Sequence, residues 1–435
     1  MKLRVIHREQ VEMAGLSEST GQDLADSYES VRQLTLRLTR SLSPEDCMIQ
    51  SMDDASPVRW HLAHTTWFFE TFILKEQPGY QEFNEQFAYL FNSYYNSLGS
   101  QFPRPQRGTI SRPGLSEILK YRDYVDQQLL TTLESGASES VQSLVRLGLH
   151  HEQQHQELIL TDIKHALATN PLLPVFESAP FGPDDKGPGN WIEVPAGQYI
   201  VGVSDSGGGL QSEFCFDNER PQHTVYLDRF SLSDQLVTCG EYMEFIESGG
   251  YEQPEHWLSL GWATVQEKNW SAPLYWKREE GQWKTFTLAG LVPVHPDWPV
   301  CHVSYFEADA FARWSGHRLP TEFEWEVACG QHPGISNGQF VDELIAEEQA
   351  IHPTLVSGGL LGSVWQWTSS SYQAYPGFRP NEGAIGEYNG KFMCNQYVLR
   401  GGSVATSQSH IRSTYRNFFP ASTRWQFAGI RVARM

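Results

Sequence analysis

The stretch Leu147-Gly-Leu-His-His-Glu-Gln-Gln-His-Gln-Glu-Leu-Ile-Leu-Thr-Asp-Ile-Lys-His165 has the apolar spacing of an amphipathic helix. Within it His151 and His155 are four residues apart, so the two imidazoles stand one above the other on one helix face. The same stripe also carries Leu144, Gly148, Leu158 and Asp162. The pair is therefore expected to point into a protein core, where neutral imidazoles can bind a metal ion.

Three further segments with helical spacing precede this stretch. The first runs from about Leu16 to Leu42 and the third from about Leu115 to Leu133. Between them, Ser56 is expected to cap a helix that has a proline at its first position and continues to about Leu74. The histidine-bearing helix is expected to end before Pro171. Four helices, two of them with inward histidines, predict an up-and-down bundle, whose core is a common place for metals.

A segment rich in proline and glycine, residues 174–190, separates this half from a second half of different texture. Beyond it, short runs of alternating polarity are interrupted by Gly, Asn, Asp and Pro, which is typical of strands and turns. These runs are Trp191 to Val203, His223 to Leu232 and Tyr397 to Val404, and helical patches lie near Cys239 to Ser248 and Tyr305 to Trp314. We therefore predict an α+β protein of two domains, residues 1–184 and 185–435.

The composition restricts the partners and the location. Thirty-two basic and 52 acidic side chains give the 435 residues a net charge of −20, which argues against nucleic acid or an anionic membrane as a partner. No apolar run reaches the roughly 18 residues of a membrane span, and Met1 to Gly15 lack the apolar core of a signal peptide. Six scattered cysteines without a C-x-x-C pair are typical of reduced thiols. A cytoplasmic protein is expected.

The segment His151-Glu-Gln-Gln-His155 also matches H-E-x-x-H, the helix signature of zinc proteases, with Glu152 in the place of the catalytic base. The extended form of that signature fails, because Leu158 and Thr161 stand where a glycine and a third histidine are required. Glu177 lies at a possible distance for another third ligand, but its proline-rich surroundings are a poor place for a rigid one. A peptidase is therefore disfavoured.

A third inward histidine lies on the helix that follows Ser56. His64 shares an aromatic-rich face of this helix, and His61 on the same helix is the alternative candidate. Three neutral histidines on two facing helices leave coordination positions open, which suits non-haem Fe(II) that handles O2 and a further ligand. The sequence thus indicates a metal site that combines His151 and His155 with a histidine of the second helix.

The roles of other polar residues of the His151 helix are predicted from their rotation around the helix axis and their position along it. Glu157 is rotated well off the histidine face and is interpreted as a partner that orients an imidazole. Gln154 lies within one face-width of His151, from where it can reach a ligand at the metal. His165 lies ~15 Å along the axis from His155, which is too far to join the site.

Several motifs together resemble one enzyme family. Ser56 to His64 and the His151-x3-His155-x-Glu157 motif look like the DinB-like bundle of the ergothioneine-pathway sulfoxide synthases. The second half resembles the formylglycine-generating-enzyme (sulfatase-modifying-factor) fold, which has a C-type-lectin-like architecture. The matching stretches are Val194 to Gly197, Trp314 to Glu326, Gly362 to Thr368, Arg400 to Ser403 and Gly429 to Arg431.

This resemblance implies an Fe(II)- and O2-dependent oxidoreductase. Such an enzyme joins a cysteine-type thiol to C2 of the imidazole of Nα-trimethylhistidine (hercynine) and oxidises the sulfur to a sulfoxide. The iron would be held by His64, His151 and His155. The segment Thr414 to Phe419 looks like the substrate segment of the family. Within the site, polar contacts to trimethylhistidine would come from Gln154 and Asn417, and aromatic contacts from Phe418 and Phe419.

Two features of this chain bear on the thiol and on the proton donor. Where the γ-glutamylcysteine-using branch has an acidic residue, this chain has Phe419, which favours free cysteine with its carboxylate held by Arg104 or Arg107. Tyr94 and Tyr95 resemble the proton-donating tyrosines of a second branch. The alternative donors, Tyr372 and Tyr375, follow the Trp365-x-Trp367 motif.

Other functions remain open beside this one. Formylglycine generation is disfavoured, because it requires a cysteine pair near the C-terminus and the last cysteine here is Cys394. A relative that uses selenium or unmethylated histidine, or a ligand-binding module with a structural metal, is the alternative. We expect small-molecule substrates and no nucleic-acid or membrane partner.

Overall fold

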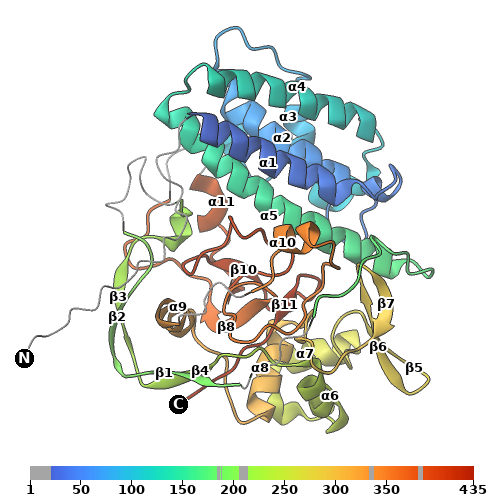
Figure 1. The fold of residues 1–435 in the computed structure, drawn as a ribbon, viewed down its shortest axis with the longest axis vertical. Coiled ribbons are helices and arrows are strands. Elements are labelled where there is room, and N and C mark those ends of the chain that lie inside the picture. The colour runs from blue at the N-terminus through green and yellow to red at the C-terminus, as the bar shows by residue number, and fades with distance from the viewer. Residues whose placement is uncertain (1–20, 184–186, 188, 205–213, 333–337, 381–385) are drawn as a thin grey trace, which may run out of the picture.

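The computed structural model describes residues 21–435 except 184–186, 188, 205–213, 333–337 and 381–385 (Figure 1). Its N-terminal half contains the long helices α1 (Gly21–Thr39), α2 (Val58–Phe72), α4 (Leu115–Glu134) and α5 (Glu139–Thr169), with the short α3 (Phe87–Phe91) beside them. Helices α1 and α2 both pack against α4 and α5. The predicted four-helix bundle is confirmed, although the start of the first predicted helix lies outside the described residues.

The predicted cap at Ser56 is wrong. Helix α2 begins at Val58, its N-cap residue is Pro57, and no side chain caps it. The Ser56 hydroxyl instead accepts a hydrogen bond from Arg107 Nη1 at 2.9 Å, and the Ser56 backbone N–H donates to Asp162 Oδ2 at 2.8 Å. Ser56 therefore ties the start of α2 to α5 and to the loop before α4.

In the part of the C-terminal half that the structure describes, the chain forms four small sheets and several short helices. The strands are β1 (Trp191–Val194), β2 (Gly197–Val201), β3 (His223–Leu227), β4 (Phe230–Ser233), β5 (Trp276–Glu279), β6 (Gln282–Thr287), β7 (Gly290–Pro293), β8 (Trp365–Ser371), β9 (Gln396–Arg400), β10 (Asn417–Pro420), β11 (Ala428–Gly429) and β12 (Ala433–Arg434). The helices are α6 (Cys239–Glu247), α7 (Ser259–Lys268), α8 (Tyr305–Trp314), α9 (Glu322–Gln331), α10 (Val341–Ala346) and α11 (Glu387–Gly390). The predicted α+β class of this half is confirmed.

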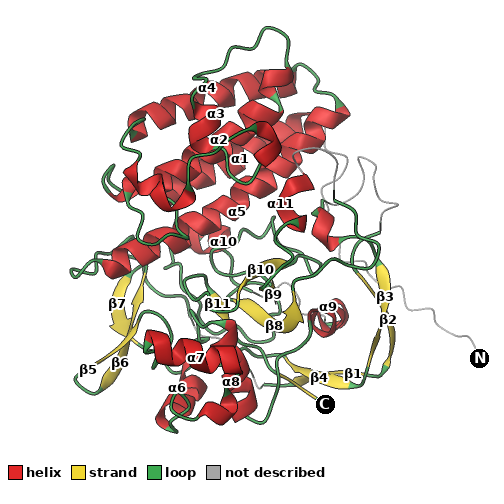
Figure 2. Cartoon of the chain, turned by 180° about the vertical axis from the view of Figure 1, so that it is seen from behind, coloured by secondary structure: helices red, strands yellow, loops and turns green. Residues whose placement is uncertain are grey.

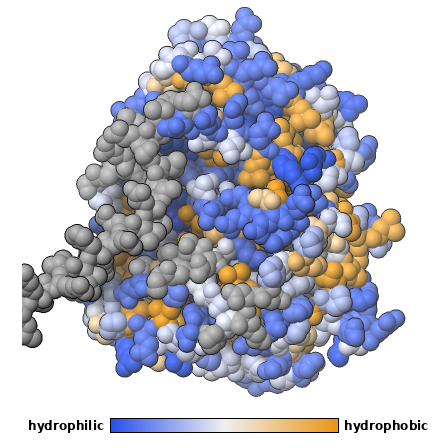
Figure 3. Space-filling model, in the orientation of Figure 1, coloured by the Kyte–Doolittle hydropathy of each residue, from blue (hydrophilic) through white to orange (hydrophobic). Residues whose placement is uncertain are grey.

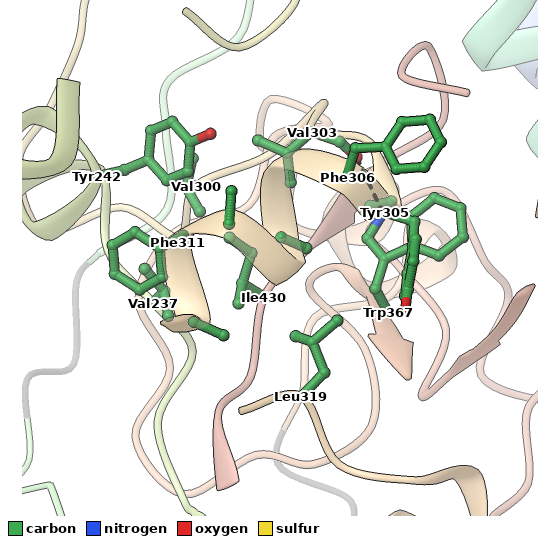
Figure 4. Close-up of a cluster of buried hydrophobic side chains, with 14 of the residues drawn as sticks. Val237, Tyr242, Val300, Val303, Tyr305, Phe306, Phe311, Leu319, Trp367 and Ile430 are labelled. Carbon is green, nitrogen blue, oxygen red and sulfur yellow. Dashed lines mark hydrogen bonds between the residues drawn. The ribbon is translucent and has the colours of Figure 1, made fainter. Parts of the chain in front are cut away.

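The sheet orders are β10-β9-β8-β11, β1-β4-β12, β2-β3 and β5-β6-β7. In the four-stranded sheet, β10 pairs antiparallel with β9, so that Asn417 stands opposite Leu399. This pairing fixes the predicted substrate segment on a sheet edge. A buried apolar cluster around α8 supports the sheet from below, with residues such as Phe311, Trp367 and Ile430 drawn in Figure 4.

Helix α5 is the element that the two halves share. It lies along the boundary between the bundle and the sheets in both views (Figures 1 and 2). Lys164 near its C-terminal end and Gln153 near its middle both donate hydrogen bonds to the second half, to His302 and Ser409 respectively. Helix α5 is therefore hydrogen-bonded to the second half at two points along its length.

The outer surface agrees with the acidic composition. On the face seen in Figure 3 hydrophilic residues predominate and apolar areas are scattered. Across the described ranges, no helix combines the length and the apolar character that a membrane-spanning helix needs.

Candidate metal centre

Three buried histidines meet between α2 and α5. His64 comes from α2, and His151 and His155 come from successive turns of α5. One ring nitrogen of each lies within 4.8 Å of the corresponding nitrogens of the other two, and all three side chains are buried. The centroid of the His64 ring is 5.0 Å from that of His151 and 4.7 Å from that of His155. The predicted trio is thus brought together with its nitrogens converging.

Hydrogen bonds on the far ring nitrogens orient two of these rings. His64 Nδ1 lies 2.6 Å from the backbone oxygen of Phe91, to which it donates, so Nε2 carries the lone pair. His155 Nδ1 lies 2.8 Å from His61 Nδ1, and His61 Nε2 lies 3.1 Å from Asp162 Oδ2. Because the carboxylate accepts from His61 Nε2, His61 Nδ1 can accept from His155, which leaves His155 Nε2 for a metal.

The geometry therefore places His61 behind the trio rather than in it. Asp162 and His61 form a carboxylate–imidazole pair of the kind that holds metal-binding histidines in one tautomer. The residue pattern contained a signal for this, because Asp162 lies on the histidine stripe, seven residues after His155. The role of imidazole orientation that we assigned to Glu157 belongs to this pair.

Glu157 faces the second half of the chain, so the predicted role is wrong. Its carboxylate accepts hydrogen bonds from Trp365 Nε1, from Thr406 Oγ1 at 2.8 Å and from Ser403 Oγ at 3.1 Å. Burial raises the pKa of this carboxyl group, and the three hydrogen bonds oppose that change. Glu157 therefore attaches α5 to the second domain and does not touch an imidazole.

Glu152 also points away from the metal position. It lies between α1 and α4, where Arg32 Nη1 is 2.8 Å from Oε2, Thr35 Oγ1 is 2.6 Å from Oε1 and Arg122 forms a further ion pair. Burial raises its pKa, but Arg122 and Arg32 outweigh this and lower the pKa to about 2. A carboxylate committed to two guanidinium groups cannot serve as the base of a zinc protease, which removes that alternative.

The trio carries no charge at neutral pH. Burial, followed by the nearby His151, lowers the pKa of His64 well below its usual value. Burial likewise lowers the pKa of His155, and it lowers that of His151 to about 4. Three neutral imidazoles without a carboxylate form a donor set that fits Fe(II) and leaves room for exogenous ligands. His165 stays apart, since its Nδ1 is bonded to Ser51 Oγ at 2.7 Å.

A cavity of about 330 Å³ opens beside the trio, and both halves of the chain line it. The predicted site residues that line it are Tyr94, Tyr95, Arg104, Arg107, Gln154, Asn417, Phe418 and Phe419. Tyr372 and Tyr375 do not line it: the Tyr372 hydroxyl accepts from Asn218, and that of Tyr375 from Arg400. The segment between α3 and α4, helix α5 and strand β10 thus surround one cavity.

The two arginines already have partners on the cavity wall. Arg104 Nη1 donates to the Tyr94 hydroxyl at 2.7 Å, whereas Arg107 lies 3.4 Å above the Trp60 ring and donates to Ser56 and Ser93. Burial lowers the pKa of Arg107 to about 9. Tyr94 is half-buried and Tyr95 is buried. Phe392, which no sequence motif indicated, also lines the cavity, and its ring lies 5.0 Å from that of Tyr94.

Comparison with known proteins gives the same two-part organisation. Residues 27–159 match the DinB superfamily, and residues 178–350 and 358–435 match the sulfatase-modifying factor enzyme 1-like domain. The chain is 31% identical to a hercynine oxygenase of Mycolicibacterium smegmatis, over 94% of this chain and 98% of that protein. It is also 31% identical to a hercynine oxygenase of Mycobacterium tuberculosis, over 95% and 98% respectively.

Other relatives are more distant and cover less of the chain. Ergothioneine biosynthesis protein 1 of Schizosaccharomyces pombe is 25% identical over 56% of this chain and 33% of its own length. The full-length matches, in contrast, span both halves and include the segments that carry the three histidines. The expected family and oxidoreductase class are confirmed: the chain belongs to the hercynine oxygenase family, in which a DinB-like bundle precedes a sulfatase-modifying-factor-like domain.

Proposed function

We propose that this chain is an Fe(II)-dependent sulfoxide synthase that joins cysteine to C2 of the imidazole of Nα-trimethylhistidine. The observation that carries the proposal is the convergence of His64, His151 and His155 on a cavity that Gln154 and the β10 segment also line. Fe(II) bound by these histidines would supply the redox chemistry with O2. The reaction balances as thiol plus imidazole C–H plus O2 giving the sulfoxide-linked product plus water.

The protein's own contribution is to hold two organic substrates in one enclosed space. Gln154 and Asn417 are proposed to bind the trimethylhistidine, and Phe418 offers an aromatic face to its cationic group. The ring of Phe418 is held by stacking on Tyr372, with 4.1 Å between the ring centroids. A fixed aromatic surface suits a trimethylammonium group, which cannot donate a hydrogen bond.

Cysteine is favoured as the thiol because Phe419 offers an apolar ring at a position where a longer donor would need a polar contact. Arg104 and Arg107 line the same cavity from the segment before α4. A single carboxylate near the sulfur can reach these guanidinium groups, and no further anionic group of the donor needs a partner. Tyr94 and Tyr95 are the proposed proton donors, with Tyr94 held by Arg104.

Two coarser features accompany this function. All six cysteines are free thiols, which supports a cytoplasmic location. The boundary between the domains is proposed near residue 185, between the end of α5 at Thr169 and the start of β1 at Trp191.

The test is O2 uptake after anaerobic reconstitution with Fe(II). Trimethylhistidine is supplied with either cysteine or γ-glutamylcysteine, and the product mass is determined. The proposal expects O2 uptake that requires both substrates and a sulfoxide adduct of cysteine. A γ-glutamylcysteine adduct would overturn the thiol assignment alone. Absence of uptake with either thiol, in protein shown to hold iron, would direct attention to a selenium donor or to a binding module.

A further inference from the structure

A chain of hydrogen bonds runs behind Gln154, away from the cavity. Gln154 Nε2 donates to the Tyr415 hydroxyl at 2.7 Å, and that hydroxyl lies 3.2 Å from His410 Nε2. His410 Nδ1 lies 2.9 Å from His150 Nδ1. His150 and Gln154 are one turn apart on α5. The row of hydrogen bonds therefore starts on this helix, passes through two residues of the second domain and returns to the same helix.

The middle of this chain is shielded from solvent. Tyr415 and His410 are 4% and 2% exposed, and the ring of His150 stacks on Phe214 at 3.9 Å between centroids. The guanidinium group of Arg412 lies 5.0 Å from the centroid of the Tyr415 ring. Water therefore has little access to these hydrogen bonds.

Burial, together with His150 and Arg412, lowers the pKa of His410 well below its usual value. The charge of Arg412 is itself balanced by Glu219, with 2.8 Å between Nε and Oε2. A neutral His410 carries one N–H and one lone pair. The direction of every hydrogen bond in the chain then follows from which nitrogen of His410 holds the hydrogen.

The observed orientation of Gln154 selects one of the two directions. Because its amide nitrogen donates to Tyr415, the Tyr415 hydroxyl is available to donate to His410 Nε2. His410 then donates from Nδ1 to His150. The Gln154 carbonyl oxygen Oε1 is left for the cavity. The opposite tautomer of His410 would reverse the chain and turn the amide nitrogen of Gln154 toward the cavity instead.

We propose that Tyr415, His410 and His150 are positioning residues that hold Gln154 with Oε1 toward the cavity, which makes the site selective for a ligand with a ring N–H. An imidazole bound to the metal through one nitrogen carries such an N–H on the other. This inference rests on the proposed function for the identity of the imidazole substrate, but it concerns the Gln154 acceptor itself.

The test compares the binding of imidazole and 1-methylimidazole, which lacks the N–H, to the Fe(II)-loaded protein under anaerobic conditions by calorimetry. The unaltered protein is expected to prefer imidazole, and both Tyr415→Phe and His410→Leu are expected to reduce this preference about tenfold. His410→Gln retains an acceptor for the Tyr415 hydroxyl and is expected to restore most of it. Iron content is measured for each variant.

A matched control removes a different hydrogen bond between α5 and the second domain. Ser409→Ala removes the 2.7 Å hydrogen bond from Gln153, which also joins α5 to the second domain but has no link to Gln154. This variant is expected to leave the preference unchanged. If Tyr415→Phe or His410→Leu retains its iron and keeps the preference within twofold, the inference is overturned. Equal binding of both probes by the unaltered protein would overturn it as well.

The failure of the proposed function has a different signature. In that case the protein would retain the preference for imidazole, and its sensitivity to His410→Leu, but would consume no O2 with trimethylhistidine and a thiol. The two results therefore separate the acceptor role of Gln154 from the identity of the reaction.

Discussion

Lys164 allows a quantitative test of the contact between α5 and the second domain. Its ammonium group is fully buried, and Nζ lies 2.7 Å from His302 Nε2 and 4.8 Å from the centroid of the Phe427 ring. Burial lowers the pKa of Lys164 from 10.5 to about 8. Since each pH unit corresponds to roughly 1.4 kcal/mol, keeping the ammonium charged in the folded protein at pH 7 costs about 3 kcal/mol.

The substitution Lys164→Met keeps the length of the side chain and removes the buried charge. It also removes one hydrogen bond, worth about 1 kcal/mol. We therefore expect the variant to be more stable than the parent at pH 7 by roughly 2 kcal/mol in the free energy of unfolding, since the ~3 kcal/mol charge penalty exceeds that loss. Urea denaturation followed by tryptophan fluorescence measures this difference.

The pH dependence gives the second part of the test. Between pH 8 and 10.5 the unfolded parent holds the lysine proton and the folded parent has lost it, so the stability of the parent rises with pH relative to the variant. The advantage of Lys164→Met should therefore disappear by about pH 10.5. Lys120→Met, at an exposed position of α4, controls for the loss of one positive charge. A variant less stable than the parent at pH 7, or a difference that stays constant up to pH 10.5, would refute the reasoning.

Four further predictions concern the metal centre and its support. His64→Ala should lose bound iron after anaerobic reconstitution, whereas His61→Asn should retain iron with an affinity roughly 10–100-fold weaker, as measured by competition with a chelator. Glu157→Leu removes the carboxylate that accepts three hydrogen bonds from the second domain and should lower the free energy of unfolding by about 3 kcal/mol, with Glu157→Gln less affected; equal stability of parent and Leu variant would contradict the docking role. Arg122→Met leaves Glu152 with a single guanidinium and should destabilise the fold by roughly 3–5 kcal/mol. The Glu152 carboxylate stabilises the protein fully above its unfolded pKa of 4.5, and this contribution should be lost as the pH falls toward 2, so Glu152→Gln should flatten the acid limb of the stability profile.

Helical periodicity predicted the metal centre because it determines the direction in which each side chain leaves the helix. Two histidines four residues apart on an apolar stripe must face the same neighbour, and the structure places α2 there with His64. Periodicity could not identify the neighbour on the other faces. Periodicity placed Glu157 correctly on a face of α5 that points away from the histidines. It could not show that the second domain packs against that face. The carboxylate was therefore predicted to bind an imidazole, whereas it binds Trp365 and Ser403.

Local capping patterns in the sequence predict some helix starts correctly and others wrongly. Helix α9 begins with a capping box in which the Thr321 hydroxyl and the Glu324 side chain satisfy each other's backbone N–H groups. This T-x-x-E pattern is present in the sequence and would have predicted the helix. At Ser56 the local signal predicted a helix cap that does not form. The Ser56 hydroxyl instead accepts a hydrogen bond from Arg107, which lies far away in the sequence. Tertiary competition for one hydroxyl is not encoded in its immediate neighbours.

The position of the three histidines relative to β10 follows from three faces of α5. At about 100° per residue, Glu152 lies about 100° from His151 in one direction and Glu157 about 120° in the other. One face meets α2 through the histidines, one is clamped by Arg32 and its neighbours, and one is bonded to the second domain. A rotation of the helix that improved one face would break the other two. The bundle and the second domain therefore hold the three histidines and β10 in a fixed relation, although none of these histidines lies on β10.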